Sequence, residues 1–384
     1  MKIDATKSPG SFRFVSLGDV HLGHHQTPTA KIIENLDRYC TNDQVLKDVD
    51  MLIITGDLFD RLLHNADDSL HLINRWITRV LYRCAYLDVA IRIVEGTPSH
   101  DRGQSRFFVE QAKNAKINVD LYYATQLEIE HNERFGITIL YIPDKWRPDT
   151  TETLEEVKLL MRKQGLEQVD YAIMHGAFEY QLPSIVKEPT HDSATYLSLV
   201  RYFILIGHVH LMTQLERILA AGSYDRICHG EEGPKGYYDV RVRGPDDYDV
   251  VFVENKGAKR YDTLDCTGLD TKELNVKIRK VVETLPKGSA IRLRCSPHDA
   301  AAGDIDGLVK LYPQFEWSIV KDREKVKKES VLDTFMNTDM EEFIPITKDS
   351  IEGLAEQELE RQGLDTAFVA NCTHRLKELL SGLH

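Results

Sequence analysis

The sequence lacks several features that would assign it to a common class. It has no run of about 20 apolar residues, so no membrane helix is expected. Its opening, MKIDATKSPG, has no apolar segment typical of a secretory signal. The six cysteines form no CxxC pair, which argues against a cysteine zinc site and is typical of reduced thiols. We therefore expect a cytoplasmic protein, of a bacterium or of an infected host cell, without a membrane partner.

Positive charge is also scarce. The 384 residues include 48 Lys and Arg against 61 Asp and Glu, which leaves a net charge of −13. This balance at first argues against a nucleic-acid partner. The negative charge is unevenly distributed, however, because segment 333–365 has ten acidic and two basic residues and so carries eight of the net charges. The composition therefore does not exclude a basic DNA-binding surface elsewhere.

What the sequence does contain is an alternation of apolar runs and amphipathic helices. Runs typical of buried strands occupy 12–19, 51–57, 89–96, 137–144, 171–176 and 202–210. Helical spacing is found in 29–39, 68–87 and 104–115. Strands that are apolar along their whole length are typically buried on both faces, with helices covering the sheet. The pattern predicts an α/β fold.

The chain changes character toward its C-terminus. Residues 259–330 read as a small β-α-β-α-β unit, and two helices are expected near 350–361 and 366–382. We therefore expect three domains, at 1–258, 259–330 and 331–384. The last helix would carry an apolar stripe formed by Phe368, Val369, Cys372, Leu376, Leu379 and Leu380. This stripe would dock on a partner or pack against the chain's own domains, and both interpretations stay open.

Histidine and aspartate collect where the apolar runs end. They are Asp19 and His21 in GDVHLG, Asp57 in GDLFD, His100 and Asp101 in GTPSHD, His175 in MHG, and His208 and His210 in GHVH. Any one of them is more often a turn former or a hydrogen-bonded structural residue. The ordered set as a whole favours a metal site instead. Strand ends in α/β sheets bring distant residues together, and residues i and i+2 can point the same way and bind one ion.

Imidazole and carboxylate ligands suit Mn²⁺, Fe²⁺ or Zn²⁺ better than Ca²⁺. A pair of such ions, about 3.5–4 Å apart, needs a shared carboxylate and activates a water for in-line displacement at phosphorus. A histidine outside the metal shell can protonate the leaving oxygen. The residue types therefore favour hydrolysis of a phosphate ester.

The order D-x-H, G-D-x-x-D, H-D, H-G and G-H-x-H resembles that of the calcineurin-like metallophosphoesterases. GDVHLG followed by GDLFD is most similar to the SbcD-type nuclease subunits of the double-strand-break repair complex, as is segment 221–240 with its GS…E…KG pattern. The resemblance implies a β-sandwich flanked by helices (four layers, αββα), a capping domain that contacts DNA, and C-terminal helices that bind an SbcC-like ATPase. It also implies a homodimer, for which 30–40 and 66–86 are candidate helices. The compact length would fit a phage-encoded member.

The resemblance also implies roles for single residues. One metal ion would be held by Asp19, His21 and His210, and the other by His175 and His208, with Asp57 between the two ions. His100 would be the general acid, oriented by Asp101. The family reads GNHD at this place and uses its Asn as a ligand of the second ion, whereas this chain reads GTPSHD with Ser99 in the Asn position. A serine hydroxyl is a poorer ligand than an amide oxygen. Ser99 would therefore bind the second ion weakly, or a water would replace the amide, or the second site would be weak altogether.

Three further residues directly follow the metal motifs and are candidates for binding substrate phosphates: His24, Arg61 and Arg102. A solvated loop charge is an equally good interpretation of each.

The leading hypothesis is a Mn²⁺-dependent DNA exonuclease or endonuclease that acts with an SbcC-like ATPase in DNA repair or recombination. A phosphoesterase for nucleotides or small phosphodiesters would explain the same metal motifs. A catalytically weak scaffold that bridges DNA and the ATPase is a third hypothesis, which rests on the altered GTPSHD loop.

Overall fold

A computed structural model describes residues 11–64, 67–144, 146–183, 185–296, 299, 305–321 and 375. The chain divides into two units, residues 1–322 and 323–384, and the helices and strands given below lie in the first unit. The two helices expected near 350–361 and 366–382, and the apolar stripe on the second of them, lie outside the described residues. The expected division into three domains stays a prediction.

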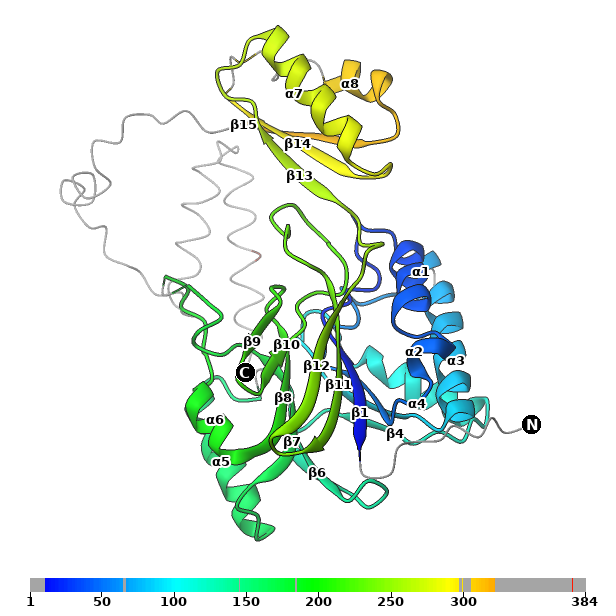
Figure 1. Cartoon of the computed structure of the whole chain (residues 1–384), viewed down its shortest axis with the longest axis vertical. Helices are drawn as coiled ribbons and strands as arrows, with labels where there is room; N and C mark the ends of the chain where they lie inside the picture. The colour runs from blue at the N-terminus through cyan, green and yellow to red at the C-terminus, as the bar shows by residue number, and fades with distance from the viewer. Residues whose placement is uncertain are drawn as a thin grey trace, which may run out of the picture. The chain divides into compact units, whose positions relative to one another are not determined.

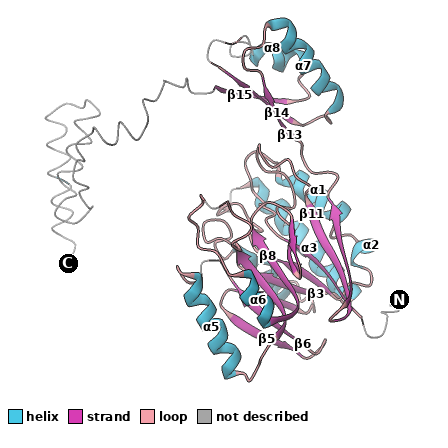
Figure 2. Ribbon diagram, turned by 60° about the vertical axis from the view of Figure 1, so that its left-hand side comes forward, coloured by secondary structure: helices cyan, strands magenta, loops and turns pink. Residues whose placement is uncertain are grey.

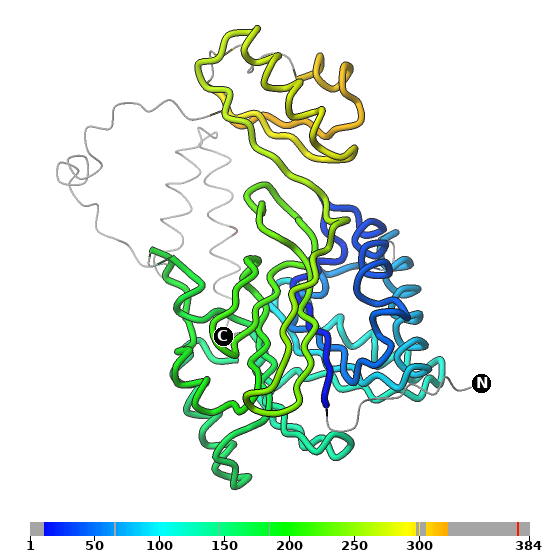
Figure 3. The backbone as a smooth tube through the Cα atoms, in the orientation of Figure 1, coloured from blue at the N-terminus to red at the C-terminus, as the bar shows by residue number. Residues whose placement is uncertain are grey.

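The first sheet has six strands and contains the N-terminal part of the chain. Four strands are parallel to one another: β1 (Phe12–Leu17), β2 (Met51–Ile54), β3 (Ala90–Val94) and β4 (Leu121–Ala124). The hairpin of β11 (Gly236–Gly244) and β12 (Asp247–Glu254) pairs antiparallel with β1. Strands β1 and β11 are far apart in the sequence and yet lie side by side, as the blue and yellow-green traces show (Figure 3).

The second sheet also has six strands, in the order β5-β6-β7-β8-β10-β9. Its parallel strands are β6 (Ile137–Ile142), β7 (Val169–Gly176), β8 (Val200–His208) and β10 (Ile218–Ala220). The antiparallel edge strands are β5 (Glu128–Asn132) and β9 (Thr213–Leu215). The long strands β7 and β8 both end in histidine-containing motifs, so their carboxyl ends bring these side chains to one edge of the sheet.

The two sheets pack face to face, and helices cover the outer face of each (Figures 1 and 2). Side chains alternate between two cores, since Phe14 of β1 lies between the sheets while Val15 packs against the helices. Phe14 meets Tyr171 of β7 edge to face, with ring centroids 5.8 Å apart. The helices on the first sheet are α1 (Thr29–Tyr39), α2 (Asp43–Leu46), α3 (Asp68–Leu87) and α4 (Phe107–Asn114); those on the second are α5 (Thr150–Lys163) and α6 (Ser193–Leu199).

Residues 261–321 form a small module with a parallel sheet and a core of its own. The order is β13 (Tyr261–Asp265), α7 (Thr271–Thr284), β14 (Ala290–Cys295), α8 (Ile305–Leu311) and β15 (Glu316–Lys321). Helix α7 begins with a capping box in which Asp270 and Glu273 satisfy each other's backbone amides. Leu264, Ile278 and Ile291 belong to the core of the module. The expected β-α-β-α-β order is therefore present.

The mixed α/β class predicted from the sequence is confirmed, and each strand and helix expected in the described residues is present. The sequence pattern did not predict β4, β5, β9 and β10 or the helices α2, α5 and α6. Two of these strands, β5 and β9, are short, partly exposed sheet edges that lack the apolar run by which a buried strand is recognised. Assignment to the metallophosphoesterase family stays a prediction.

Candidate metal centre

The predicted site residues lie at the carboxyl ends of five strands or in the loops that follow them. Asp19 follows β1, Asp57 follows β2, His100 follows β3, and His175 and His208 end β7 and β8. Several of these residues have left-handed backbone conformations, which are uncommon outside glycine: Asp19 (φ 49°), His21 (φ 53°), Asp57 (φ 47°) and His208 (φ 112°). Such strain persists only where surrounding structure imposes it, and it concentrates at functional sites.

Asp19, His21 and His210 form the first cluster. Each offers one ligand atom, and these atoms lie within 4.8 Å of one another. The Nε2 atoms of His21 and His210 face each other at 3.0 Å, and Asp19 and His21 are fully buried. Two imidazole nitrogens and a carboxylate oxygen converging at one point are a donor set suited to a divalent transition metal. The cluster therefore could hold a metal ion.

The second nitrogen of each imidazole in the first cluster meets a carboxylate. Nδ1 of His21 lies 3.2 Å from Asp60, and Nδ1 of His210 lies 2.6 Å from Glu231. Burial alone would lower the pKa of His210, but the hydrogen bond with Glu231 raises it. Carboxylates at this position orient a metal-binding histidine and make it a stronger ligand.

Glu231 is itself held in place by a buried lysine. Lys235 is 2% exposed, and its Nζ donates to Oγ of Ser223 at 2.6 Å and to the carbonyl of His210 at 2.9 Å. The same ammonium lies 3.2 Å from the Glu231 carboxylate. Burial would raise the pKa of Glu231, but His210 and Lys235 together lower it to about 2. Glu231 is therefore ionised at neutral pH beside His210.

Asp57, His175 and His208 form the second cluster, whose ligand atoms also lie within 4.8 Å of one another. Nε2 of His175 lies 3.3 Å from the Asp57 carboxylate, and its Nδ1 donates to the carbonyl of Thr55 at 2.6 Å. Burial alone would lower the pKa of His175, but Asp57 raises it to about 10. The remaining nitrogen of His208, Nε2, lies 3.0 Å from Glu188. This cluster too could hold a metal ion.

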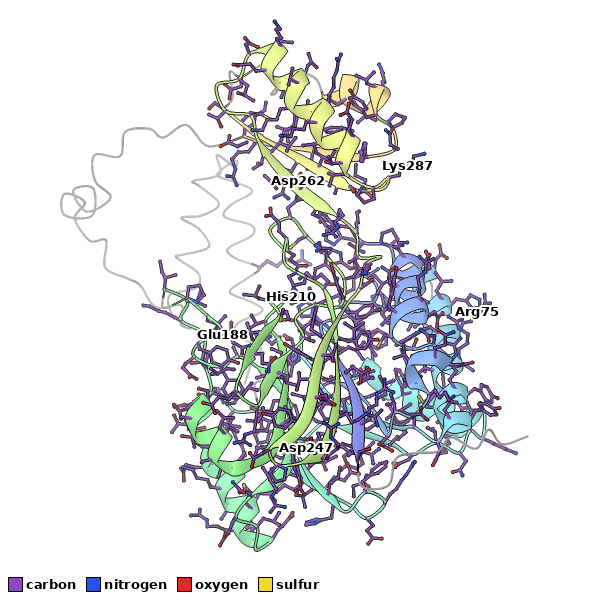
Figure 4. All side chains as sticks on the ribbon, in the orientation of Figure 1. Arg75, Glu188, His210, Asp247, Asp262 and Lys287 are labelled. Atoms are coloured by element: carbon purple, nitrogen blue, oxygen red, sulfur yellow. The ribbon has the colours of Figure 1, made fainter. Side chains whose placement is uncertain are left out.

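The two clusters are joined through the backbone. The amide of His208, from the second cluster, donates to both carboxylate oxygens of Asp19 in the first, at 2.9 and 3.0 Å. His210 and Glu188 lie at one end of the sheets, whereas Asp247 lies at the opposite end (Figure 4). Thus the loops after the parallel strands bring both clusters to one end of the sandwich.

Thr97, rather than Ser99, occupies the place next to the second cluster. Ser99 is exposed, and its carbonyl accepts a hydrogen bond from Arg102. Thr97 is 7% exposed, and its hydroxyl lies 3.1 Å from Asp57, 3.3 Å from His175 and 3.4 Å from His208. The structure therefore does not place Ser99 beside the second cluster, and its role as a ligand stays a prediction. In the longer GTPSHD loop, the residue directly after Gly96, and not the residue directly before His100, enters the site.

His100 lies beside the first cluster but is oriented differently from what was expected. Its Nδ1 donates to the carbonyl of Asp60 at 2.6 Å, and its ring lies edge-on to His21 with centroids 5.0 Å apart. Asp101 was expected to orient it. The Asp101 carboxylate instead accepts hydrogen bonds from the backbone amides of Phe59 and Gly96. The loop turns the Asp101 carboxylate inward, toward these two amides, and its role in orienting His100 stays a prediction. Burial raises the pKa of Asp101 to about 7.

The three predicted substrate-binding residues lie in loops near the clusters and have local partners. Nδ1 of His24 accepts hydrogen bonds from the backbone amides of Gln26 and Thr27. Arg61 pairs with Asp67 at 2.5 Å, and exposed Arg102 donates to the Ser99 carbonyl. The pairing of Arg61 favours a structural role for its charge, and phosphate binding by these residues stays a prediction.

Sequence reasoning missed the residues that support the clusters: Asp60, Thr97, Glu188, Glu231 and Lys235. Two signals could have identified some of them. Asp60 is the second acid of GDLFD, and Glu231 and Lys235 belong to the GS…E…KG segment. Glu188 lies in the long loop between β7 and α6, and no motif marks it.

Comparison with known proteins leaves the family open. No family model matches the chain, and no curated protein matches it. It is similar to the crystal structure of TT1561 of Thermus thermophilus, with 11% identity over 63% of this chain and 98% of that one and a TM-score of 0.36. A second crystal structure has 10% identity over 63% of this chain and 99% of its own, also with a TM-score of 0.36. Similarity this low indicates nothing about activity.

Among the described residues, no helix is both long enough and apolar enough to cross a membrane.

Proposed function

We propose that the chain is a metal-dependent phosphodiesterase that cleaves DNA, a nuclease of the SbcD type on a metallophosphoesterase sandwich. The observation that carries the proposal is the pair of adjacent Asp/His clusters, Asp19–His21–His210 and Asp57–His175–His208. Six such side chains, divided between two groups, exceed the three or four that a single ion takes from a protein. We propose two divalent ions, most readily Mn²⁺, with Asp57 between them.

Two divalent ions held here would supply an activated water and would neutralise the charge of a bound phosphate. The chain's own residues would hold the reacting groups in place. Asp60 and Glu231 fix the imidazoles of His21 and His210, and the Thr55 carbonyl fixes His175. Since a carbonyl only accepts, Nδ1 of His100 carries a proton toward Asp60. When His100 is also protonated on Nε2, that nitrogen can donate to the leaving oxygen.

The partners and the wider biological role belong to the same proposal. An SbcC-like ATPase would bind segment 331–384, whose net negative charge and expected apolar stripe would suit docking in a groove. A homodimer would form through helices of the first unit, and DNA would be shared with the capping module. The alternative substrates, nucleotides or small phosphodiesters, would use the same metal centre.

Cleavage assays on the full chain test the proposal. Duplex DNA, single-stranded DNA and a chromogenic phosphodiester would each be incubated with Mn²⁺ and, separately, with a chelator. Mn²⁺-dependent cleavage of DNA is expected. Hydrolysis of the small ester alone would favour the alternative substrates, and inactivity toward all three with Mn²⁺ bound would favour the scaffold hypothesis.

A further inference from the structure

The hydroxyl of Thr97 lies among the ligand atoms of the second cluster. Its Oγ1 atom is 3.1 Å from Oδ2 of Asp57, 3.3 Å from Nε2 of His175 and 3.4 Å from Nδ1 of His208. Nε2 of His175 and Oδ2 of Asp57 are themselves 3.3 Å apart. A fourth oxygen or nitrogen atom therefore joins the three that the cluster offers to a metal ion.

These separations suit four ligands of one small ion. Zinc binds nitrogen and oxygen at about 2.0–2.2 Å, so the corners of a tetrahedron around it are about 3.3–3.6 Å apart. The distances from Thr97 to the two imidazole nitrogens fall in this range, as does the distance from His175 to Asp57. The distance from Thr97 to Asp57 is only slightly shorter.

Hydrogen bonds on the far side of each imidazole direct a lone pair toward the hydroxyl. Nδ1 of His175 donates to the carbonyl of Thr55 at 2.6 Å, so the neutral ring keeps its lone pair on Nε2. Nε2 of His208 lies 3.0 Å from the carboxylate of Glu188, which leaves the lone pair on Nδ1. The Thr97 hydroxyl has one hydrogen and can donate to only one of its three neighbours. A cation would satisfy all of them.

The backbone fixes Thr97 in this position. Its amide donates to Oδ1 of Asp57 at 2.6 Å, so both oxygens of this carboxylate contact Thr97. Gly96, directly before it, packs so closely that a Cβ atom there would lie 2.2 Å from the amide nitrogen of Asp57. Thr97 is 7% exposed, Asp57 is 2% exposed and His175 is fully buried. An ion held here would therefore take its ligands mainly from the protein.

Four protein ligands make a different site from three. Closed zinc sites take four protein ligands in a tetrahedral arrangement, whereas Mn²⁺ suits a larger shell that is rich in oxygen and includes water. The first cluster offers two imidazoles and one carboxylate, which leaves positions for water. The second cluster with Thr97 has the ligand number of a closed site.

We propose that Thr97 is a direct ligand of the second ion and that this site prefers a four-coordinate Zn²⁺, while Mn²⁺ occupies the first site. Thr97 thereby determines which metal the second site selects, and the centre holds two different ions. The proposal rests on the metal centre of the proposed function, but it does not depend on cleavage of DNA.

Co²⁺ binding to the full, metal-free chain tests the proposal. Co²⁺ is the probe because its four-coordinate form absorbs visible light far more strongly than its six-coordinate form, so the spectrum reports the geometry. One site should give intense bands and the other weak ones. Zn²⁺ should abolish the intense bands, whereas an excess of Mn²⁺ should leave them in place.

Substitutions assign the intense bands to Thr97. Thr97→Val, which keeps the shape and removes the hydroxyl, should lose these bands and weaken Zn²⁺ binding about 10-fold, as the loss of a supporting group at a metal site does. Thr97→Ser, which keeps the hydroxyl, should retain both the bands and the affinity. Exposed Thr151→Val is the matched control and should behave like the unmodified chain.

Four results would overturn the proposal: no saturable Co²⁺ binding, weak bands at both sites, intense bands that persist in Thr97→Val, or an equal loss in Thr97→Ser. The outcome is separable from that of the nuclease proposal. Intense bands in a chain that cleaves no DNA would support this assignment and contradict the nuclease. Two six-coordinate sites in an active nuclease would do the reverse.

Discussion

The two histidine clusters are alike in composition but differ in what holds their imidazoles. In the first, both outward-facing ring nitrogens meet carboxylates, Asp60 and Glu231. In the second, His175 donates to a main-chain carbonyl, and only His208 meets a carboxylate, Glu188. Since a carboxylate partner strengthens a histidine ligand, the first cluster should bind a metal ion more tightly than the second.

The neutral residue beside the second cluster, Thr97, also indicates that this cluster binds a metal ion more weakly than the first. Thr97 places a hydroxyl within 3.4 Å of Asp57, His175 and His208. A hydroxyl is a weak neutral ligand, and here it already donates to Asp57. The comparison indicates that Mn²⁺ would fill the first site before the second, and that activity would follow occupancy of the second.

The largest effect is expected from Asp57, the residue proposed to lie between the ions. Asp57→Asn should abolish Mn²⁺-dependent cleavage, a loss of at least about 1,000-fold, because it removes a charge that both ions would need. The DNA cleavage rate measures this, and circular dichroism should show an unchanged fold. Exposed Asp246→Asn is the matched control and should keep full activity. Full activity of Asp57→Asn would refute the shared-ligand assignment.

His100 tests whether a residue outside both clusters performs chemistry. His100→Gln should lower the cleavage rate about 100-fold, as loss of a general acid does. The metal content should stay at two ions per chain, measured by elemental analysis after dialysis. If one ion is lost instead, His100 is a ligand, and the proton donor lies elsewhere.

Glu231 and Glu188 probe the two clusters separately. Glu231→Gln should weaken the tighter Mn²⁺ site about 10- to 100-fold, because His210 loses its carboxylate partner. Glu188→Gln should weaken only the other site, through His208. Calorimetric titration with Mn²⁺ resolves the two steps. If both variants weaken the same step, the two clusters form one site.

Substitutions of Thr97 should change the Mn²⁺ affinity of the second site by a smaller factor than the glutamate substitutions do. Thr97→Asn replaces the hydroxyl with an amide oxygen and should tighten the weaker Mn²⁺ step several-fold, whereas Thr97→Val should weaken it. Exposed Ser99→Ala should change neither step. Equal affinities for the two ions in the unmodified chain would contradict the contrast between the clusters.

A last effect, at the buried side chain of His191, appears in stability and leaves activity unchanged. Since burial lowers the pKa of His191 to about 4, the unfolded chain takes up a proton below pH about 6.5, while the folded chain does not until about 4. The free energy of unfolding should therefore fall as the pH falls through this window, by about 3 kcal/mol in all. Urea unfolding should show a smaller loss between pH 7.5 and 5 for His191→Phe than for His71→Phe, and equal losses would be contrary to this assignment.

The core strands and the clustered ligands were predictable because each depends on a local pattern. Apolar runs such as Met51–Ile54 are buried on both faces, and parallel strands leave their carboxyl ends at one edge. The residues after those runs, Asp19 and His208 among them, had to meet there. The partly exposed edge strands β5 and β9 escaped prediction because they lack such runs.

The parts that could not be predicted depend on loop geometry. The loop from Gly96 to Asp101 turns so that Thr97 enters the site and Ser99 faces solvent. Asp101 is drawn inward by two backbone amides, which leaves the Asp60 carbonyl to orient His100. Glu188 reaches His208 from a loop with no motif. Such contacts depend on tertiary structure, so the spacing of residues in the sequence does not predict them.

The most direct test of the proposed centre is X-ray diffraction from crystals grown with Mn²⁺, recorded at the manganese absorption edge. Two anomalous peaks about 3.5–4 Å apart are expected, one among Asp19, His21 and His210 and a weaker one among Asp57, His175 and His208. A single peak, peaks of equal occupancy at limiting Mn²⁺, or peaks away from these residues would contradict a two-metal centre with unequal sites.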